Sequence, residues 1–225
     1  MVLIPGFMLD ETLWDDFIAN FTGERNFIPV SLTQGNSIDE IATNITKTLP
    51  ERFILAGFSL GGYVARAIYD ANPDRTAAMI LIATSLRADS DRQKESRIAA
   101  ASATSAKEFR GLSTTAIRKS LHTDSAFDAV TIDRIRNMGK RLGAEVFKAQ
   151  SGLNRERITI KPVTCPVYVI AAKQDQLRSM TEAEELAALT SAHLEYIDSC
   201  GHLIPVEKPL ELAHLLASWL TDKGL

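Results

Sequence analysis

Short apolar runs rich in β-branched and aromatic residues alternate along this chain with segments whose apolar residues recur every three to four positions. The runs predict buried strands, and the recurring positions predict helices with one apolar face. Six runs lie at residues 2–5, 26–31, 53–58, 77–83, 166–172 and 193–197. This alternation is typical of an α/β protein with a mainly parallel sheet and flanking helices.

The helical pattern is clearest near the start of the chain and at its end. Apolar side chains repeat at helical spacing over residues 13–21 and 38–49, and we expect both helices to pack on the sheet. A third helix is expected over residues 61–71, because Pro73 disfavours helix in the residue ahead of it. The last helix is expected over residues 209–220.

The alternation of strands and helices stops between residues 86 and 157. This stretch contains no strand-like run, and its polar and alanine-rich segments predict helices at residues 92–104, 113–121 and 132–148. No repeat, low-complexity tract or linker separates it from the rest of the chain. We therefore interpret residues 86–157 as a helical cap inserted into a single domain that spans residues 1–225.

Length and composition indicate the general class of protein. The chain has 225 residues, of which 45% are hydrophobic and 24% charged, and this is enough for one domain with a buried core. Its net charge of −3 is too small to favour nucleic acid or an anionic membrane. No apolar run reaches the roughly 18 residues that cross a bilayer, and the N-terminus lacks a signal-peptide pattern. We expect a cytoplasmic protein that acts on a small molecule, with its oligomeric state left open.

The cysteines give no sign of metal or redox chemistry. Cys165 and Cys200 are the two thiols of the chain, and neither lies in a paired metal-ligand spacing. We expect both to be reduced structural residues. We expect no metal and no cofactor.

A G-x-S-x-G pattern occupies residues 57–61, directly after a predicted strand and directly before a predicted helix. This is the context of a nucleophile elbow, a sharp strand-to-helix turn that exposes a reactive serine. We therefore predict Ser59 as a nucleophile. Glycines at positions 57, 61 and 62 would let the turn pack closely. The alternative is an ordinary glycine-rich turn with a surface serine.

A serine hydroxyl needs a base at neutral pH, and histidine has the suitable pKa. His202 lies in a loop after the last predicted strand and before the last helix, where loops at strand ends carry function. We predict His202 as the general base. His122 lies in the polar insertion, His193 opens a strand and His214 lies on the last helix, so we expect structural roles for these three.

The histidine in turn needs a carboxylate that holds its ring in one tautomer and stabilises its charged form. Asp175 follows the strand at residues 166–172, and its place in the chain gives the order nucleophile, acid, histidine. We predict Asp175 as this acid. Asp198 is closer in sequence to the histidine, and Asp89 or Asp91 could serve if the acid followed the preceding strand.

Backbone amides are expected to stabilise the negative charge that develops on the substrate. Leu60 directly follows the predicted nucleophile and opens a helix, whose positive end points toward this charge. The second amide should come from the loop after the first strand, and we predict Phe7, because Gly6 lets the backbone turn toward the serine. The alternative is a plain Pro-Gly turn.

These segments together resemble the α/β-hydrolase superfamily over nearly the whole chain. The matching parts are the Pro5-Gly6-Phe7 loop, the elbow at residues 57–62, the Lys173-Gln174-Asp175 loop, and Gly201-His202 followed by Pro205, Glu207 and Pro209. The chain is similar to compact bacterial members with a helical cap between the sixth and seventh strands. Two features depart from the family: many members have His-Gly at Pro5-Gly6, and the usual first two antiparallel strands are missing.

The resemblance implies a carboxylesterase-like serine hydrolase. Ser59 would attack a carbonyl carbon while His202 takes its proton, the oxyanion would lie between the amides of Phe7 and Leu60, and water would release the acyl group. An ester or thioester is the expected substrate. The same fold hosts carbon-carbon bond hydrolases, lyases and non-catalytic ligand-binding members, and these alternatives stay open.

Charge is unevenly distributed between the cap and the remainder. Residues 86–157 hold 15 basic and 9 acidic residues, whereas the rest of the chain holds 10 basic and 19 acidic ones. A locally positive cleft concentrates anions, so our hypothesis is a substrate that carries a carboxylate or a phosphate. The alternative is a solvated polar surface on the cap.

Overall fold

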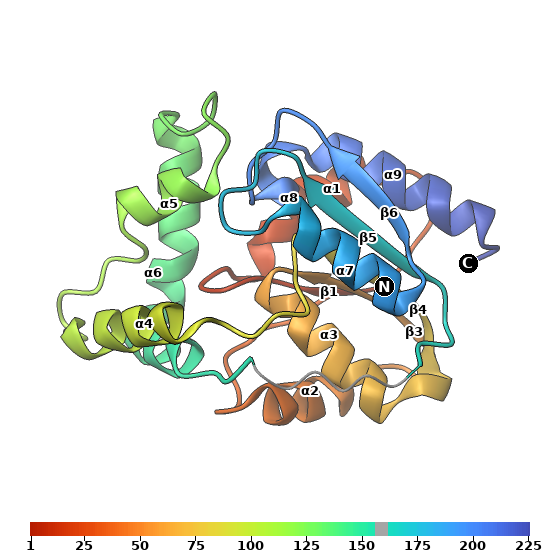
Figure 1. Cartoon of the computed structure of the whole chain (residues 1–225), viewed down its shortest axis with the longest axis horizontal. Helices are drawn as coiled ribbons and strands as arrows, with labels where there is room; N and C mark the ends of the chain where they lie inside the picture. The colour runs from red at the N-terminus through yellow and green to blue at the C-terminus, as the bar shows by residue number, and fades with distance from the viewer. Residues whose placement is uncertain (156–161) are drawn as a thin grey trace.

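The computed structural model describes residues 1–155 and 162–225, which build a six-stranded sheet flanked by helices (Figure 1). The strand order is β2-β1-β3-β4-β5-β6, and every neighbouring pair is parallel. The strands are β1 (Val2–Ile4), β2 (Ile28–Pro29), β3 (Phe53–Phe58), β4 (Thr76–Ile82), β5 (Val167–Ala172) and β6 (His193–Ile197). Each lies at one of the six apolar runs, so the expected α/β class is confirmed.

Helices fill most of the connections between strands. They are η1 (Glu11–Trp14), α1 (Asp15–Asn20), α2 (Ile38–Thr46), α3 (Leu60–Ala71), η2 (Pro73–Arg75), α4 (Asp91–Ala103), α5 (Thr114–Ser120), α6 (Ala129–Ser151), α7 (Met180–Thr190), α8 (Ile204–Glu207) and α9 (Pro209–Asp222). The sequence pattern did not predict α7 or α8. The buried face of α7 is formed largely by small residues such as Ala183 and Ala187, and α8 is a single turn.

The two faces of the sheet support two apolar layers. Along β3, Ile54, Ala56 and Phe58 join one buried cluster, whereas Phe53 and Leu55 join the other, because successive strand residues point to opposite faces. Helices α1 and α9 cover the first face, and α2, α3 and α7 cover the second (Figure 1). The sheet is therefore buried on both sides, as parallel sheets usually are.

An aromatic cluster fixes α1 on its face of the sheet. Phe17 is fully buried, and its ring centroid lies 5.7 Å from that of Trp14, 5.7 Å from that of Phe21 and 5.8 Å from that of Phe27. On the same face, Trp219 of α9 stacks on a tyrosine of β5 with 5.1 Å between the ring centroids. These large side chains supply much of the apolar area that the sheet buries.

Helices α4, α5 and α6 follow β4 and precede β5, and they extend to one side of the sheet (Figure 1). Their place in the chain, between the fourth and fifth of the six described strands, is the place where the sequence predicts the helical cap. Helix α6 is broken at Gly143, where φ is 82°. The expected cap boundary at residue 157 lies outside the described residues.

Apolar side chains of the cap helices α5 and α6 pack into the core of the sheet. Ile117 and Leu121 at α5, and Ile132, Ile135 and Met138 of α6, are buried in the same apolar cluster as α1 and α9. Within the described ranges, no helix combines the length and apolar character needed to span a bilayer.

We expect Phe17→Ala to lower the free energy of unfolding by about 3–5 kcal/mol, because it removes a fully buried ring from a packed cluster. Phe127→Ala makes the same chemical change at a side chain that is 75% exposed, and it should cost below about 1 kcal/mol. Urea denaturation of both variants measures the difference. Equal losses would contradict the packing described for α1.

Candidate active site

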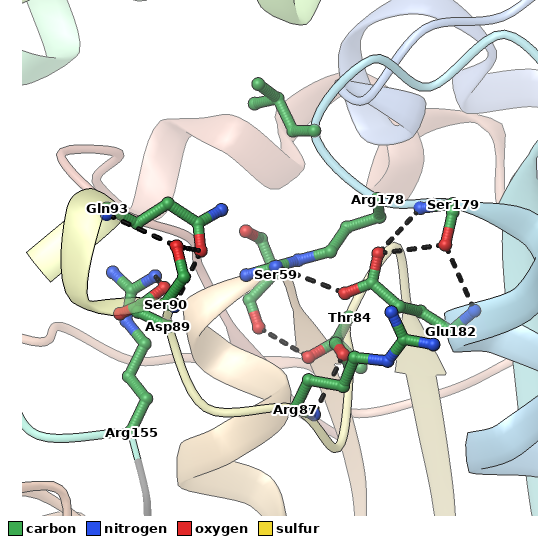
Figure 2. Close-up of polar contacts among 12 residues, drawn as sticks. Ser59, Thr84, Arg87, Asp89, Ser90, Gln93, Arg155, Arg178, Ser179 and Glu182 are labelled. Atoms are coloured by element: carbon green, nitrogen blue, oxygen red, sulfur yellow. Dashed lines mark hydrogen bonds and ion pairs between the residues drawn. The ribbon is translucent and has the colours of Figure 1, made fainter.

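Ser59 lies at the turn between β3 and α3 and has a strained backbone. Its φ is 51° and its ψ is −112°, a region that residues with a side chain rarely adopt. The turn is held in place because the amide of Ser59 donates to the carbonyl of Ile82 in β4, and the hydroxyl of Thr84 donates to the carbonyl of Ser59, at 2.9 and 2.8 Å. Figure 2 shows Thr84 beneath this turn. The serine side chain is thereby presented at the carboxyl end of the sheet.

Glycine is required around the turn because backbone segments approach one another closely. A Cβ at Gly57 would lie 2.4 Å from the carbonyl oxygen of Gly61, and a Cβ at Gly61 would lie 2.3 Å from the carbonyl oxygen of Ile4. A Cβ at Gly62 would lie 2.5 Å from the side chain of Thr84. Real Cβ atoms do not make such contacts, so any side chain here would force the strand and helix apart.

Three predicted side chains meet in a hydrogen-bonded chain. Nε2 of His202 lies 2.9 Å from Oγ of Ser59, and Nδ1 lies 2.7 Å from Oδ2 of Asp175. An ionised carboxylate only accepts hydrogen bonds, so Nδ1 carries the proton and Nε2 faces the serine as an acceptor. The side chains of His202 and Asp175 are 6% and 2% exposed, so this contact is screened from water.

The loop after β5 fixes the orientation of the aspartate. Oδ1 of Asp175 accepts hydrogen bonds from the amides of Leu177 and Arg178, at 2.7 and 3.0 Å. This leaves Oδ2 for the imidazole. The ring of Phe58 packs against the His202 ring with 5.2 Å between the centroids and restricts its movement.

The alternative carboxylates lie outside this hydrogen-bonded chain. Asp198 binds Nζ of Lys173 at 2.8 Å and Nε2 of Gln174 at 2.9 Å, and the bond from Lys173 contributes most to holding the pKa of Asp198 well below its usual range. Asp89 forms ion pairs with two arginines, and Asp91 is exposed at the start of α4. The structure gives none of these three a contact with His202.

The remaining histidines also lie away from the serine. Nδ1 of His122 accepts a hydrogen bond from the amide of Asp124 at 3.3 Å. His193 is exposed beside Glu195, and His214 is exposed on α9. The structure therefore joins Ser59, His202 and Asp175 in one hydrogen-bonded chain, in which none of the other candidates takes part.

The loop after β1 lies against the turn that carries Ser59, because a Cβ at Gly61 would be 2.6 Å from the carbonyl oxygen of Pro5. Phe7 and Ser59 line the same cavity, and the amides of Phe7 and Leu60 have no hydrogen-bond acceptor among the described residues. The next residue, Met8, has a φ of 56°, and its amide donates to Oε1 of Gln150 at 2.8 Å. Neither amide therefore donates to another described residue, and one of the two directly follows Ser59 in the chain.

Two polar residues, the buried Gln150 and the partly buried Glu207, support the site in roles that the sequence did not predict. Gln150 of α6 is 1% exposed, and its Nε2 also donates to the carbonyl of Leu32 at 3.2 Å. Glu207 accepts from the amides of His122 and Gly201, at 2.7 and 3.1 Å, and burial raises the pKa of this carboxyl. The amides of Met8 and His122 lie 142 and 85 residues from the side chains that bind them, so no local pattern marks these two contacts.

A cavity of about 600 Å³ opens over the serine. Its apolar wall includes Phe7, Leu9, Phe58, Leu112, Ile135 and Leu203, and the body and the cap both contribute to it. This volume suits a small molecule. The residues that the structure describes contain no group of histidine, cysteine and carboxylate side chains that could hold a metal ion.

A serine at a strand-to-helix turn, bonded to a histidine that is bonded to an aspartate, is the arrangement typical of α/β-hydrolases. Comparison with known families agrees with it. The chain belongs to the alpha/beta hydrolase family, whose sequence model matches residues 1–215.

Curated relatives are distant. The biotin biosynthesis bifunctional protein BioHC of Cellvibrio japonicus is 26% identical over 94% of this chain and 45% of its own length. The pimeloyl-[acyl-carrier protein] methyl ester esterase of Citrobacter koseri is 29% identical over 38% of this chain and 36% of its own length. The chain thus matches less than half the length of either relative.

Solved structures match over nearly the whole chain. A thermophilic esterase from Thermogutta terrifontis is 26% identical, with a TM-score of 0.79, and the match covers 98% of this chain and 89% of the esterase. The enol-lactonase from Burkholderia xenovorans LB400 has a TM-score of 0.85 at 18% identity, and covers 98% and 90% of the two chains. The second likeness is one of fold alone.

We expect Gly61→Ala to lower the free energy of unfolding by about 2 kcal/mol or more, because the new methyl group overlaps the backbone of β1. Gly152→Ala is the matched control. A Cβ at Gly152 has its nearest neighbour at 3.6 Å, an ordinary contact, so its effect should stay within about 1 kcal/mol. Urea denaturation compares the two, and a Gly61→Ala protein as stable as the wild type would refute the close approach.

Proposed function

We propose that this protein is a serine hydrolase that cleaves a small-molecule ester or thioester through an acyl-enzyme intermediate. The observation that carries the proposal is the hydrogen-bonded chain from Ser59 through His202 to Asp175, at 2.9 and 2.7 Å, beside a cavity of substrate size. Geometry of this kind activates a hydroxyl that is otherwise a weak nucleophile.

In the first step, Oγ of Ser59 attacks the carbonyl carbon of the substrate as its proton passes to Nε2 of His202. Asp175 accepts the Nδ1 proton in a hydrogen bond, which holds the ring in place and stabilises its positive charge. The serine already bonds to Nε2, so the proton transfer needs no rearrangement of the side chains.

The oxyanion formed by this attack would accept hydrogen bonds from the amides of Phe7 and Leu60. Leu60 is the first residue of α3, so the positive end of the helix dipole adds to the stabilisation. Donors that are fixed before the reaction need no reorganisation as charge develops, and this makes them effective. Gln150 would hold the Phe7 loop in place through the amide of Met8.

The tetrahedral intermediate collapses when His202 returns the proton to the leaving alcohol or thiol, and the acyl group stays on Ser59. A water molecule then gives its proton to His202 and attacks the acyl carbon. Release of the carboxylic acid returns the proton to Oγ of Ser59. One histidine thus serves as base and acid in both halves of the reaction.

The relatives support an ester bond as the target. One curated relative is a methyl ester esterase, and a solved structure at 26% identity is a thermophilic esterase. The bond from the serine hydroxyl to the histidine favours catalysis over a purely ligand-binding role, because a receptor does not need an activated serine. Carbon-carbon bond hydrolysis or a lyase reaction would use the same side chains, and product analysis separates them from ester hydrolysis.

We expect a fluorophosphonate probe to label wild-type protein at one site per chain, as measured by intact mass, and Ser59→Ala to take up no label. The probe reacts with activated serines and needs no knowledge of the substrate. Ser102→Ala, at an exposed serine of α4, is the control and should label fully. A folded wild type that takes up no label would favour the ligand-binding alternative.

We expect Asp175→Asn to lower kcat for 4-nitrophenyl butanoate about 10³- to 10⁴-fold, because an amide in this place cannot stabilise the imidazolium. Asp198→Asn makes the same change one loop away, at a carboxylate that binds Lys173, and should alter kcat less than about threefold. Circular dichroism checks that both variants fold. A larger loss at Asp198 would transfer the acid role to that residue.

A further inference from the structure

The cavity above Ser59 is lined by an excess of basic side chains. Its basic residues are Arg92, Arg97, Lys119, Arg155 and Arg178. Asp89 is the single acidic residue among the described residues that line it. A cavity with this lining attracts anions and repels cations.

Arg155 is the most deeply buried of these cations. Its side chain is 9% exposed and lies 3.4 Å from Asp89, whose own side chain is 8% exposed. Asp89 also pairs with Arg97, so one carboxylate serves two guanidinium groups. Burial lowers the pKa of Arg155 to about 10; Asp89 opposes this, and the nearby charges of Arg97 and Arg178 lower it further.

Arg178 comes from the loop that carries the catalytic aspartate. Its backbone amide donates to Asp175, and in Figure 2 its side chain extends toward Ser59. The side chain is 14% exposed and lies 3.4 Å from Glu182 of α7. Glu182 is already bound by the amide and hydroxyl of Ser179, at 2.8 and 3.1 Å. Glu182 therefore pairs with Arg178 and also takes part in the N-terminal capping box of α7.

The arginine side chains around this cavity outnumber the carboxylates that pair with them. Three guanidinium groups, those of Arg97, Arg155 and Arg178, face two carboxylates within the part of the chain that the structure describes. The Nε atoms of all three arginines are buried and have no hydrogen-bond partner there. Leaving a positive charge and its donors unpaired in a cavity is costly, and a bound anion would remove that cost.

We propose that Arg155 and Arg178 form a carboxylate-binding subsite in the Ser59 cavity, so that the ester substrate carries a free carboxylate. This inference rests on the proposed ester hydrolysis and specifies its substrate class. The planar fork of a guanidinium group matches the two oxygens of a carboxylate. One uncompensated positive charge suits a carboxylate better than a phosphate monoester, whose charge at neutral pH approaches about −2.

The test compares esters that differ only in this charge. On the acyl side, the 4-nitrophenyl monoester of adipic acid is compared with the 4-nitrophenyl ester of adipic acid monoamide. On the alcohol side, 4-carboxyphenyl butanoate is compared with 4-carbamoylphenyl butanoate. Amide and carboxylate have nearly the same shape, so the ratio of kcat/KM within each pair reports recognition of the charge. The Ser59→Ala protein supplies the rate of background hydrolysis.

We expect the carboxylate to be preferred about 10- to 100-fold in one of the two pairs, which also identifies the half of the substrate that binds the arginines. Arg178→Gln and Arg155→Gln should each reduce that ratio to within about threefold of unity, and Arg178→Lys should keep part of it. Arg87→Gln is the matched control, because Arg87 pairs with Glu185 and is absent from the cavity lining. It should retain the wild-type ratio.

Inhibition of the wild type by free adipate, compared with adipamide, tests the same subsite even if an arginine variant fails to fold. Stronger inhibition by adipate supports the proposal. A ratio near unity in both ester pairs, with equal inhibition by the two compounds, would overturn it, as would a carboxylate preference that survives both Arg→Gln variants. Phosphate ester substrates preferred over carboxylates would overturn the choice of anion.

Failure of the subsite and failure of the proposed function give different results. If only the subsite is wrong, the amide-bearing esters are hydrolysed and fluorophosphonate labels Ser59, but no carboxylate preference is found. If ester hydrolysis itself is wrong, none of the four esters is turned over above the Ser59→Ala background.

Discussion

The left-handed backbone of Ser59 is the constraint on which the rest of the site depends. A residue with a side chain held at φ 51° and ψ −112° costs on the order of 1–3 kcal/mol, so its surroundings must oppose relaxation. They do so through the close approach of Gly57 to Gly61, the contact of Gly61 with Ile4, and the bond from the serine amide to β4. This turn places Ser59 directly before the first amide of α3.

The parallel pairing of the strands then brings the other segments of the site to the same edge of the sheet as Ser59. Strands β1, β3, β5 and β6 all end at the same edge, so the loops after them deliver Phe7, Ser59, Asp175 and His202 to one place. This is the general reason that α/β sheets carry their sites at the carboxyl ends of their strands. Pairing of the strands thus brings together four segments that are distant in sequence.

The sequence alone predicted those features of the fold and site that short local patterns mark. Strand positions follow from apolar runs, and Ser59 and His202 follow from a glycine pattern and a loop position. Asp175 was predicted from the order of the three residues along the chain, with Asp198 as one alternative. The structure adds what the sequence could not, namely that Lys173 and Gln174 bind Asp198 in the folded protein. Gln150 lies 142 residues from Met8, and a contact at that separation leaves no periodic or spacing signal.

Two hydrogen-bonding side chains link the cap to the loops that carry the predicted site residues. Gln150 of the cap binds the loop after β1, and Glu207 of the body joins His122 of the cap to the loop that carries His202. The cap is therefore not an interchangeable module. A chimaera that took its cap from another member of the family would need to supply both a side-chain acceptor for the amide of Met8 and a backbone amide for Glu207, so an exchanged cap must match the loops of this body at two separate points.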